Sequence, residues 1–183
     1  MPRIYLSPSV QEYNLFAGGG TEEEYANAIA DAMEPYLYAS EIDFTRNNPD
    51  MSLSQVIAAS NAGNYDFHLA IHSNAGPEAL SGLLMGPDVY YYLTSDNGKR
   101  MANLIVANME SIYPNPALVD AVPTFTLAEL RRTDAPAALV EVAYHDNLED
   151  AQWIRDNIDN IARELTRSVA QYFNIPFVEP VAS

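Results

Sequence analysis

Two of the three histidines in this 183-residue chain lie in the segment Asp66–Ala75, which reads DFHLAIHSNA. Apolar residues alternate along the segment and small polar residues end it, which predicts a β-strand running into a loop. Residues two or four apart in a strand share a face, so His68 and His72 are expected to point the same way. His72 would stand at the carboxyl end of the strand, where open α/β sheets usually bind ligands. A histidine in a strand is more often packed or hydrogen-bonded than catalytic, but a second segment favours catalysis.

That second signal is Glu141, a glutamate inside the apolar run Leu139–Ala143. A carboxylate in a buried strand is costly unless it is paired, bound to a metal or protonated. Glu141 is therefore a candidate general acid or base, and the alternative is that it faces solvent from an edge strand. His145 and Asn147 follow on the loop side of the strand, where sites form. His145 could equally be a packing histidine.

A third group of candidates is the run of glutamates Glu22–Glu24, which follows Thr21. Thr21 is a predicted helix N-cap, and Glu24 three residues later completes a possible capping box. Carboxylates in the first turn of a helix interact favourably with the helix dipole, which is the expected role of two of the three. One of them could instead turn inward as a metal ligand, and the run itself does not identify which.

Strands and helices alternate around these residues. Strands are predicted at Arg3–Leu6, Glu41–Thr45, Asp66–His72, Gly82–Met85, Val89–Leu93 and Ala138–Ala143. Helices are predicted from Thr21, with Pro35 expected to kink or shorten its end, at Leu53–Ala62, from Ser95 to about Tyr113, and at Leu148–Phe173 with a break near Asp156. Phe125–Arg131 is predicted as a short helix or turn, and Pro114, Pro116 and Pro123 as a long loop. This pattern predicts a single-domain α/β fold, with a mixed, mostly parallel, twisted sheet and helices on both faces. Residues 1–176 are assigned to the domain and 177–183 to a C-terminal tail, frayed from Asn174 onward.

Composition excludes several classes of function. The chain has 25 acidic and 9 basic residues, a net charge of −16, which disfavours nucleic acid and anionic lipid as partners. It has no cysteine, which excludes disulfides, thiolate zinc sites and cysteine nucleophiles, so a metal would need His, Asp, Glu, or amide or carbonyl oxygen. No apolar run reaches 18 residues, so no membrane span is predicted. The N-terminus lacks the long apolar core of a signal peptide, so we expect a cytosolic protein, a phage-type product released by lysis, or a domain of a longer chain.

Four motifs, taken in order, resemble one family. Residues 42–46 (IDFTR), Asn61-Ala62 with Asp66, residues 71–75 (IHSNA) and residues 138–147 (ALVEVAYHDN) are similar to elements of the zinc-dependent N-acetylmuramoyl-L-alanine amidases of the Amidase_3 class. The resemblance covers nearly the whole chain. Each motif alone is modest, and the ordered set is fairly specific.

The resemblance implies one zinc ion and a set of site residues. It implies His72 as one ligand, Glu22 as another, with Glu23 as the fallback, and Glu141 as the residue that assists the attacking water. The family's first histidine ligand is absent, because residues 7–12 read SPSVQE. Gln11 is the expected substitute, as in a subgroup with SPS-x-Q at this place, and Glu12 is the less favoured candidate. Asn74, His145 and Asn147 are expected to bind substrate or support the site.

The resemblance therefore implies a cell-wall amidase, or the catalytic domain of an endolysin, whose partner is peptidoglycan. The bond cut would be the amide between N-acetylmuramic acid and L-alanine. Gln11 is a poorer zinc ligand than histidine, so the alternative is a catalytically weakened wall-binding or regulatory domain on the same scaffold. A zinc peptidase acting on other peptides would share all of these residues.

Overall fold

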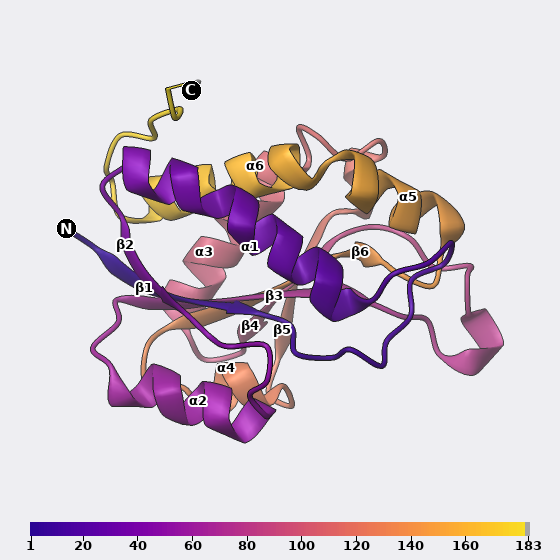
Figure 1. The fold of residues 1–183 in the computed structure, drawn as a ribbon, viewed down its shortest axis with the longest axis horizontal. Helices are drawn as coiled ribbons and strands as arrows, with labels where there is room; N and C mark the ends of the chain where they lie inside the picture. Colours follow the sequence, from indigo (N-terminus) through magenta and orange to yellow (C-terminus); the bar gives the residue numbers. More distant parts are fainter. Residues whose placement is uncertain (182–183) are drawn as a thin grey trace.

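The computed structural model describes residues 1–181, in which a six-stranded sheet lies between two layers of helices (Figure 1). The strands follow the order β2-β1-β3-β6-β4-β5 across the sheet. Their bounds are β1 Arg3–Pro8, β2 Asp43–Arg46, β3 Phe67–Asn74, β4 Asp88–Tyr92, β5 Asp120–Thr124 and β6 Ala137–Tyr144. Neighbours pair in parallel except β4 with β6, so the prediction of a mixed, mostly parallel α/β sheet is confirmed.

The central strand β3 is buried from Phe67 to Ser73, because helices cover both faces of the sheet there. Phe67, Leu69 and Ile71 belong to the main hydrophobic core, whereas Ala70 packs in a second, smaller cluster with Leu139 of β6. Side chains on a strand alternate between faces, so His68 and His72 share the face of Ala70. The two histidines therefore stand on the face with the smaller apolar cluster.

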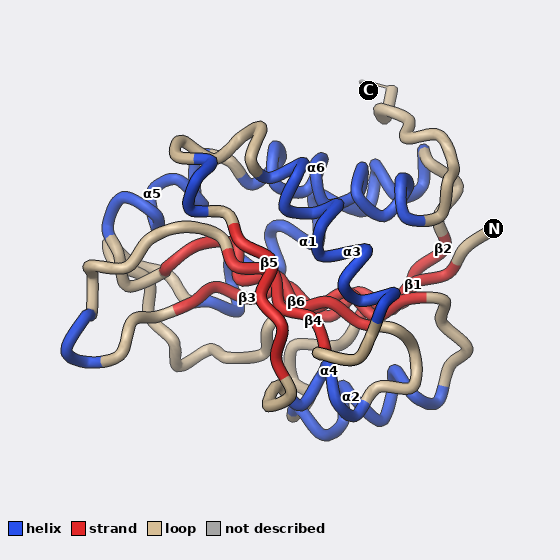
Figure 2. The backbone as a smooth tube through the Cα atoms, turned by 180° about the vertical axis from the view of Figure 1, so that it is seen from behind, coloured by secondary structure: helices blue, strands red, loops and turns tan. Residues whose placement is uncertain are grey.

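One face of the sheet is covered by four helices (Figure 2). They are α1 Glu22–Ala39, α3 Asp96–Met109, α5 Leu148–Asp156 and α6 Ile158–Tyr172. Their apolar stripes are fully buried, as Ile29 and Met33 of α1 and Leu165 of α6 show. Asn157 separates α5 from α6, one residue from the predicted break at Asp156. None of the helices within residues 1–181 is long and apolar enough to cross a membrane.

The opposite face carries α2 Leu53–Ala62 and α4 Ala128–Arg132 (Figure 2). A full capping box between Ser52 and Gln55 begins α2, which stops where Gly63 follows in an extended conformation. Two 3-10 turns, η1 Glu78–Leu80 and η2 Pro116–Leu118, complete the described elements. This thinner layer leaves room for a cavity above the carboxyl ends of the strands.

The structure corrects four details of the prediction. Gly82–Met85 forms no strand: Gly82 and Leu83 lie in a turn, and Gly82 and Gly86 both have positive φ. Strand β5, expected as loop because of Pro123, exists, because an edge strand with one paired side tolerates proline. Pro35 lies inside α1, which continues to Ala39. The tail, expected to be frayed, contacts the domain as far as Glu179, whose carboxylate accepts a hydrogen bond from Arg163 Nε at 2.6 Å. Residues 182–183 of the predicted tail lie outside the described residues.

Candidate active site

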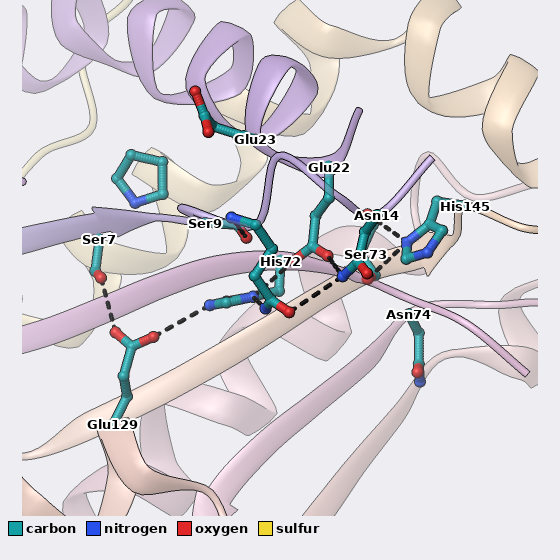
Figure 3. A network of polar contacts seen from close by, with 12 residues as sticks. Ser7, Ser9, Asn14, Glu22, Glu23, His72, Ser73, Asn74, Glu129 and His145 are labelled. Atoms are coloured by element: carbon teal, nitrogen blue, oxygen red, sulfur yellow. Dashed lines mark hydrogen bonds and ion pairs between the residues drawn. The ribbon is translucent and has the colours of Figure 1, made fainter. Parts of the chain in front are cut away.

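The site is built around an imidazole–carboxylate pair at the carboxyl edge of the sheet. His72 stands near the end of β3, and Glu22 is the first residue of α1. The Glu22 backbone N–H donates to the Asn14 carbonyl at 2.9 Å, which fixes the start of the helix over the strand ends. Glu22 Oε1 lies 2.8 Å from His72 Nδ1, and both side chains are almost fully buried (Figure 3).

The loop after β1 brings Gln11 to the same pair. The Ser9 backbone N–H donates to the Ile71 carbonyl at 2.9 Å, so the loop continues alongside β3 toward His72. Gln11 Nε2 lies 3.3 Å from His72 Nδ1. Gln11 therefore reaches the imidazole nitrogen that also faces Glu22.

Asn14 and Tyr13 determine how the Gln11 amide is turned. Gln11 Oε1 accepts from Asn14 Nδ2 and from the Tyr13 hydroxyl, both at 3.1 Å. Asn14 Nδ2 also donates to Glu22 Oε2, and a carboxylate accepts only, so Asn14 cannot be reversed without losing this bond. In this arrangement the Gln11 nitrogen, and not its oxygen, faces His72.

A second carboxylate, Glu129, meets His72 from the opposite side (Figure 3). Glu129 belongs to the short helix α4, and its Oε1 lies 3.1 Å from His72 Nε2. Sequence reasoning missed Glu129, because a glutamate in a five-residue helix is expected to face solvent. The only available signal was its place in the run Leu127–Leu130, where apolar residues surround it.

Glu141 stands next to His72 across the sheet. The two residues are direct neighbours in the parallel pairing of β3 with β6, so their side chains leave the same face. Glu141 Oε2 is buried and has no hydrogen-bond partner within residues 1–181. An unpaired buried carboxylate oxygen is costly, and this one borders the cavity, where a ligand could satisfy it.

The carboxylates around His72 have contrasting proton affinities. Burial raises the pKa of Glu141 to about 7. The positive charge of His72 opposes this rise, and the negative charge of Glu22 adds to it. Burial would lower the pKa of His72, but hydrogen bonds to Glu129 and Glu22 raise that pKa well above its ordinary value. Burial likewise opposes ionisation of Glu22 and Glu129, yet the imidazole contacts lower the pKa of both carboxyls. The site thus holds two fixed carboxylates and one carboxyl that can exchange a proton near neutral pH.

A cavity of about 380 Å³ lies beside His72 and the carboxyls of Glu129 and Glu141. Its polar lining includes Gln11, His72, Glu129 and Glu141, and its apolar wall is formed by Met51, Leu53, Val56, Leu127 and Leu139. The wall comes from α2, from α4 and its preceding loop, and from β6. An apolar cavity with a few convergent polar groups is the usual form of a binding site for a small ligand.

The residues around His72 differ in how well they suit a zinc ion. Within residues 1–181, no group of three or more His, Asp and Glu side chains has the arrangement of a metal site. Glu22 and His72 fit as a strong pair, and the unpaired Glu141 oxygen borders the same space. Gln11 would add an amide oxygen, the usual ligating atom of an amide, only if its side chain were turned, because Asn14 and Tyr13 bond that oxygen.

Other predicted residues lie outside this cluster. Glu12 is exposed, and Glu23 points away from His72 (Figure 3). Asn74 lies 3.5 Å from Asp88, and Figure 3 shows it turned away from the Glu22 side of the strand.

His145 and Asn147 make contacts that organise the neighbouring loops. His145 Nδ1 lies 2.9 Å from the Ser73 carbonyl, and its ring stacks on Phe16. Asn147 caps α5 and donates to the Gly82 carbonyl at 2.9 Å. The predicted roles of Asn74, His145 and Asn147 toward substrate stay predictions.

Comparison with known proteins identifies the family. Residues 12–171 match the Amidase_3 family, described as N-acetylmuramoyl-L-alanine amidase. The chain belongs to the Amidase_3 family. Amidase_3 proteins are typically zinc-dependent peptidoglycan amidases that act at the cell wall. A search of curated proteins gave no match.

Solved structures of Amidase_3 proteins have the same fold. The amidase AmiC2 of Nostoc punctiforme is 19% identical with a TM-score of 0.77, covering 94% of this chain and 97% of its own. The catalytic domain of CwlV from Bacillus (Paenibacillus) polymyxa is 16% identical with a TM-score of 0.74, covering 96% and 100%. The catalytic domain of the CD27L endolysin targeting Clostridia Difficile is 20% identical with a TM-score of 0.77, covering 93% and 98%. At these identities the likeness establishes the fold alone.

Proposed function

We propose that this chain hydrolyses the amide bond between N-acetylmuramic acid and L-alanine in peptidoglycan, with one zinc ion as cofactor. The observation that carries the proposal is the Glu22–His72 pair at 2.8 Å, with Glu141 beside it on the neighbouring strand. Family membership supports peptidoglycan as the substrate. The site of action would be the cell wall. The chain would act there as a domain of a longer protein or as an endolysin released by lysis.

Glu22, His72 and Gln11 would hold the zinc ion. Zinc, when bound, supplies a Lewis acid that polarises the scissile carbonyl and lowers the pKa of a water molecule. The amide of Gln11 is a weaker donor than the imidazole it would replace. We therefore expect the chain to bind zinc less tightly than a site with two histidines and one glutamate.

Glu141 would move the proton. Its pKa of about 7 lets it accept a proton from the attacking water and return that proton to the leaving amine of L-alanine. The apolar wall with Leu53 and Val56 would cover the reacting bond and limit the access of other water. Tyr13, at the rim of the cavity, would contact the chain on either side of that bond.

One observation favours a second candidate, a wall-binding or regulatory domain with weakened catalysis. The Gln11 oxygen is engaged by Asn14 and Tyr13, so its nitrogen faces His72 at 3.3 Å. An amide fixed in this way contributes no ligand atom. The site would then keep only two strong ligands and bind zinc poorly.

Metal analysis combined with a turbidity assay on purified cell walls separates the two candidates. The amidase proposal expects about one zinc per chain after equilibration with zinc, and falling turbidity that a chelator stops and zinc restores. A chain that sediments with walls but neither retains zinc nor clears them is a binding domain. A zinc peptidase of other specificity would bind zinc, leave walls turbid and cleave unrelated peptides.

A further inference from the structure

The proposed chemistry leaves a buried polar network unused on the α4 side of His72. Glu129 is 4% exposed and makes three side-chain contacts, which use both of its oxygens. Oε1 lies 3.1 Å from His72 Nε2, and Oε2 lies 2.7 Å from the Ser7 hydroxyl oxygen (Figure 3). Oε2 also lies 2.8 Å from His68 Nε2. His68 and Ser7 are themselves buried, so the network lies within the sheet–helix interface.

The chemistry of these contacts fixes where the protons lie. An ionised carboxylate has no hydrogen to donate, so Ser7, His68 and His72 must each donate to Glu129. His68 then carries a proton on Nε2, and its Nδ1 lies 2.9 Å from the Ser60 hydroxyl oxygen. His72 carries a proton on Nε2 for the same reason. Its other nitrogen, Nδ1, lies 2.8 Å from the Glu22 carboxylate, with Gln11 on the same side, so it also donates in the zinc-free protein. Zinc would take the place of that hydrogen.

Because Glu129 is buried, its carboxylate needs these hydrogen bonds, and they fix its orientation. An unpaired carboxylate is costly when it is buried, and Glu129 is 4% exposed beside a cavity that Leu127 and Leu139 also line. Three donated hydrogen bonds offset the cost and hold the carboxylate in one place. Because His68 and Ser7 hold one oxygen, the other is fixed toward His72.

We propose that Glu129 is a positioning residue that locks the ring of His72 with its proton on Nε2 and Nδ1 presented to zinc. A carboxylate behind a histidine ligand also makes that ligand a stronger donor, which commonly changes metal affinity by about 10- to 100-fold. In this chain the gain offsets the weak amide of Gln11. The inference rests on the proposed function for its zinc step, whereas the hydrogen bond itself does not depend on zinc.

Zinc affinity, measured by competition with a chelating dye, tests the first part. Glu129→Gln keeps the shape and removes the charge, so its affinity should fall about 10- to 100-fold below that of the wild type. Glu129→Asp keeps the charge and should recover part of the loss. The matched control is Glu164→Gln, because Glu164 is also 4% exposed but bonds Arg163 and Arg167 away from His72. The control should bind zinc like the wild type.

Nuclear magnetic resonance of the histidine rings tests the second part without zinc. The wild type should show a downfield, slowly exchanging His72 Nε2 hydrogen, assigned by its absence in His72→Ala. That signal should be lost or shifted in Glu129→Gln and unchanged in Glu164→Gln. The wild-type measurement stands even if Glu129→Gln fails to fold.

The outcomes separate this inference from the proposed function. A wild type without the Nε2 signal, or a folded Glu129→Gln that keeps both the signal and full zinc affinity, overturns the positioning role. A wild type that shows the signal but binds no zinc supports the hydrogen bond and overturns the zinc amidase proposal together with the affinity part of this inference.

Discussion

His72 and Glu141 are direct neighbours across the parallel pair β3–β6, and both side chains leave the face of the sheet that borders the cavity. This relationship places a candidate metal ligand beside a carboxyl whose pKa burial raises to about 7. The backbone pairing sets their separation, so it does not depend on loop conformation. Sites supported by regular elements hold their geometry more closely than sites on loops.

Removing either member of the Glu22–His72 pair should abolish stoichiometric zinc binding. His72→Ala and Glu22→Ala each delete one of the two strong ligands. His72 lines the cavity, Glu22 contacts it at the start of α1, and neither belongs to the main apolar core. We expect circular dichroism to show an intact fold and metal analysis to show less than stoichiometric zinc. Glu23→Ala is the matched control and should retain zinc. Full zinc content in His72→Ala would remove His72 from the site.

Glu141→Gln should retain zinc and lose activity. The amide keeps the shape of the side chain but cannot accept the proton of the attacking water. Hydrolysis of purified walls should fall by about two to four orders of magnitude, the usual contribution of a general acid or base. The exposed Glu12→Gln serves as the control and should be as active as the wild type. Near-normal turnover by Glu141→Gln would exclude Glu141 from the mechanism.

Substitutions of Gln11 should tune zinc affinity in both directions. Gln11→His would supply the imidazole that the resemblance to the family implies at this place, and it should tighten zinc binding by about 10- to 100-fold. Gln11→Ala removes the donor and should weaken binding further. Dye competition across the wild type and both variants measures the effect. Three identical affinities would mean that Gln11 does not reach the metal.

Asp146 gives a prediction about stability. Its Oδ2 accepts from the backbone N–H of Gly76 at 3.1 Å and of Gly82 at 3.0 Å, which ties together the loops beside the site. Burial opposes ionisation, but these hydrogen bonds outweigh it and lower the pKa of Asp146 below its ordinary value. Asp146→Asn should therefore lower the free energy of unfolding by about 1 to 2 kcal/mol at pH 7.

The direction of the Asp146 pKa shift determines how its contribution to the free energy of unfolding depends on pH. A carboxyl with a lowered pKa in the folded state contributes fully above its unfolded pKa of about 3.9 and loses the contribution as pH falls through the folded value. The difference between wild type and Asp146→Asn should be constant from pH 7 to about 5 and shrink below about 4. Urea unfolding at several pH values measures it, with exposed Asp156→Asn as the control. A difference that grows on acidification would contradict the assignment.

The sequence was informative where a local pattern decides the structure. Alternation around His72, the cap at Thr21 and the apolar run around Glu141 predicted the strand, the helix start and the second strand correctly. The fold class followed from the order of these elements. The motifs shared with a family then suggested which of Glu22–Glu24 turns inward, a choice that periodicity alone did not make.

Other features depend on contacts between distant segments, which local patterns do not contain. Glu129 meets His68 from 61 residues away and Ser7 from 122 residues away, so neither partner marks it as buried. Pro123 argued against a strand, yet β5 pairs only with β4 and leaves its other edge free of ladder bonds within residues 1–181. The apolar run at Gly82–Met85 resembled a strand, but positive φ at Gly82 and Gly86 bends it into turns.

The chemical identity of the ends released from purified peptidoglycan tests the central claim most directly. The account predicts new L-alanine amino termini in step with the loss of turbidity, with no new reducing sugar ends. Their release should stop when zinc is chelated, return when zinc is restored, and be nearly absent with Glu141→Gln. Release of reducing ends, of amino termini from other positions of the peptide, or of no ends by a zinc-loaded protein would contradict it.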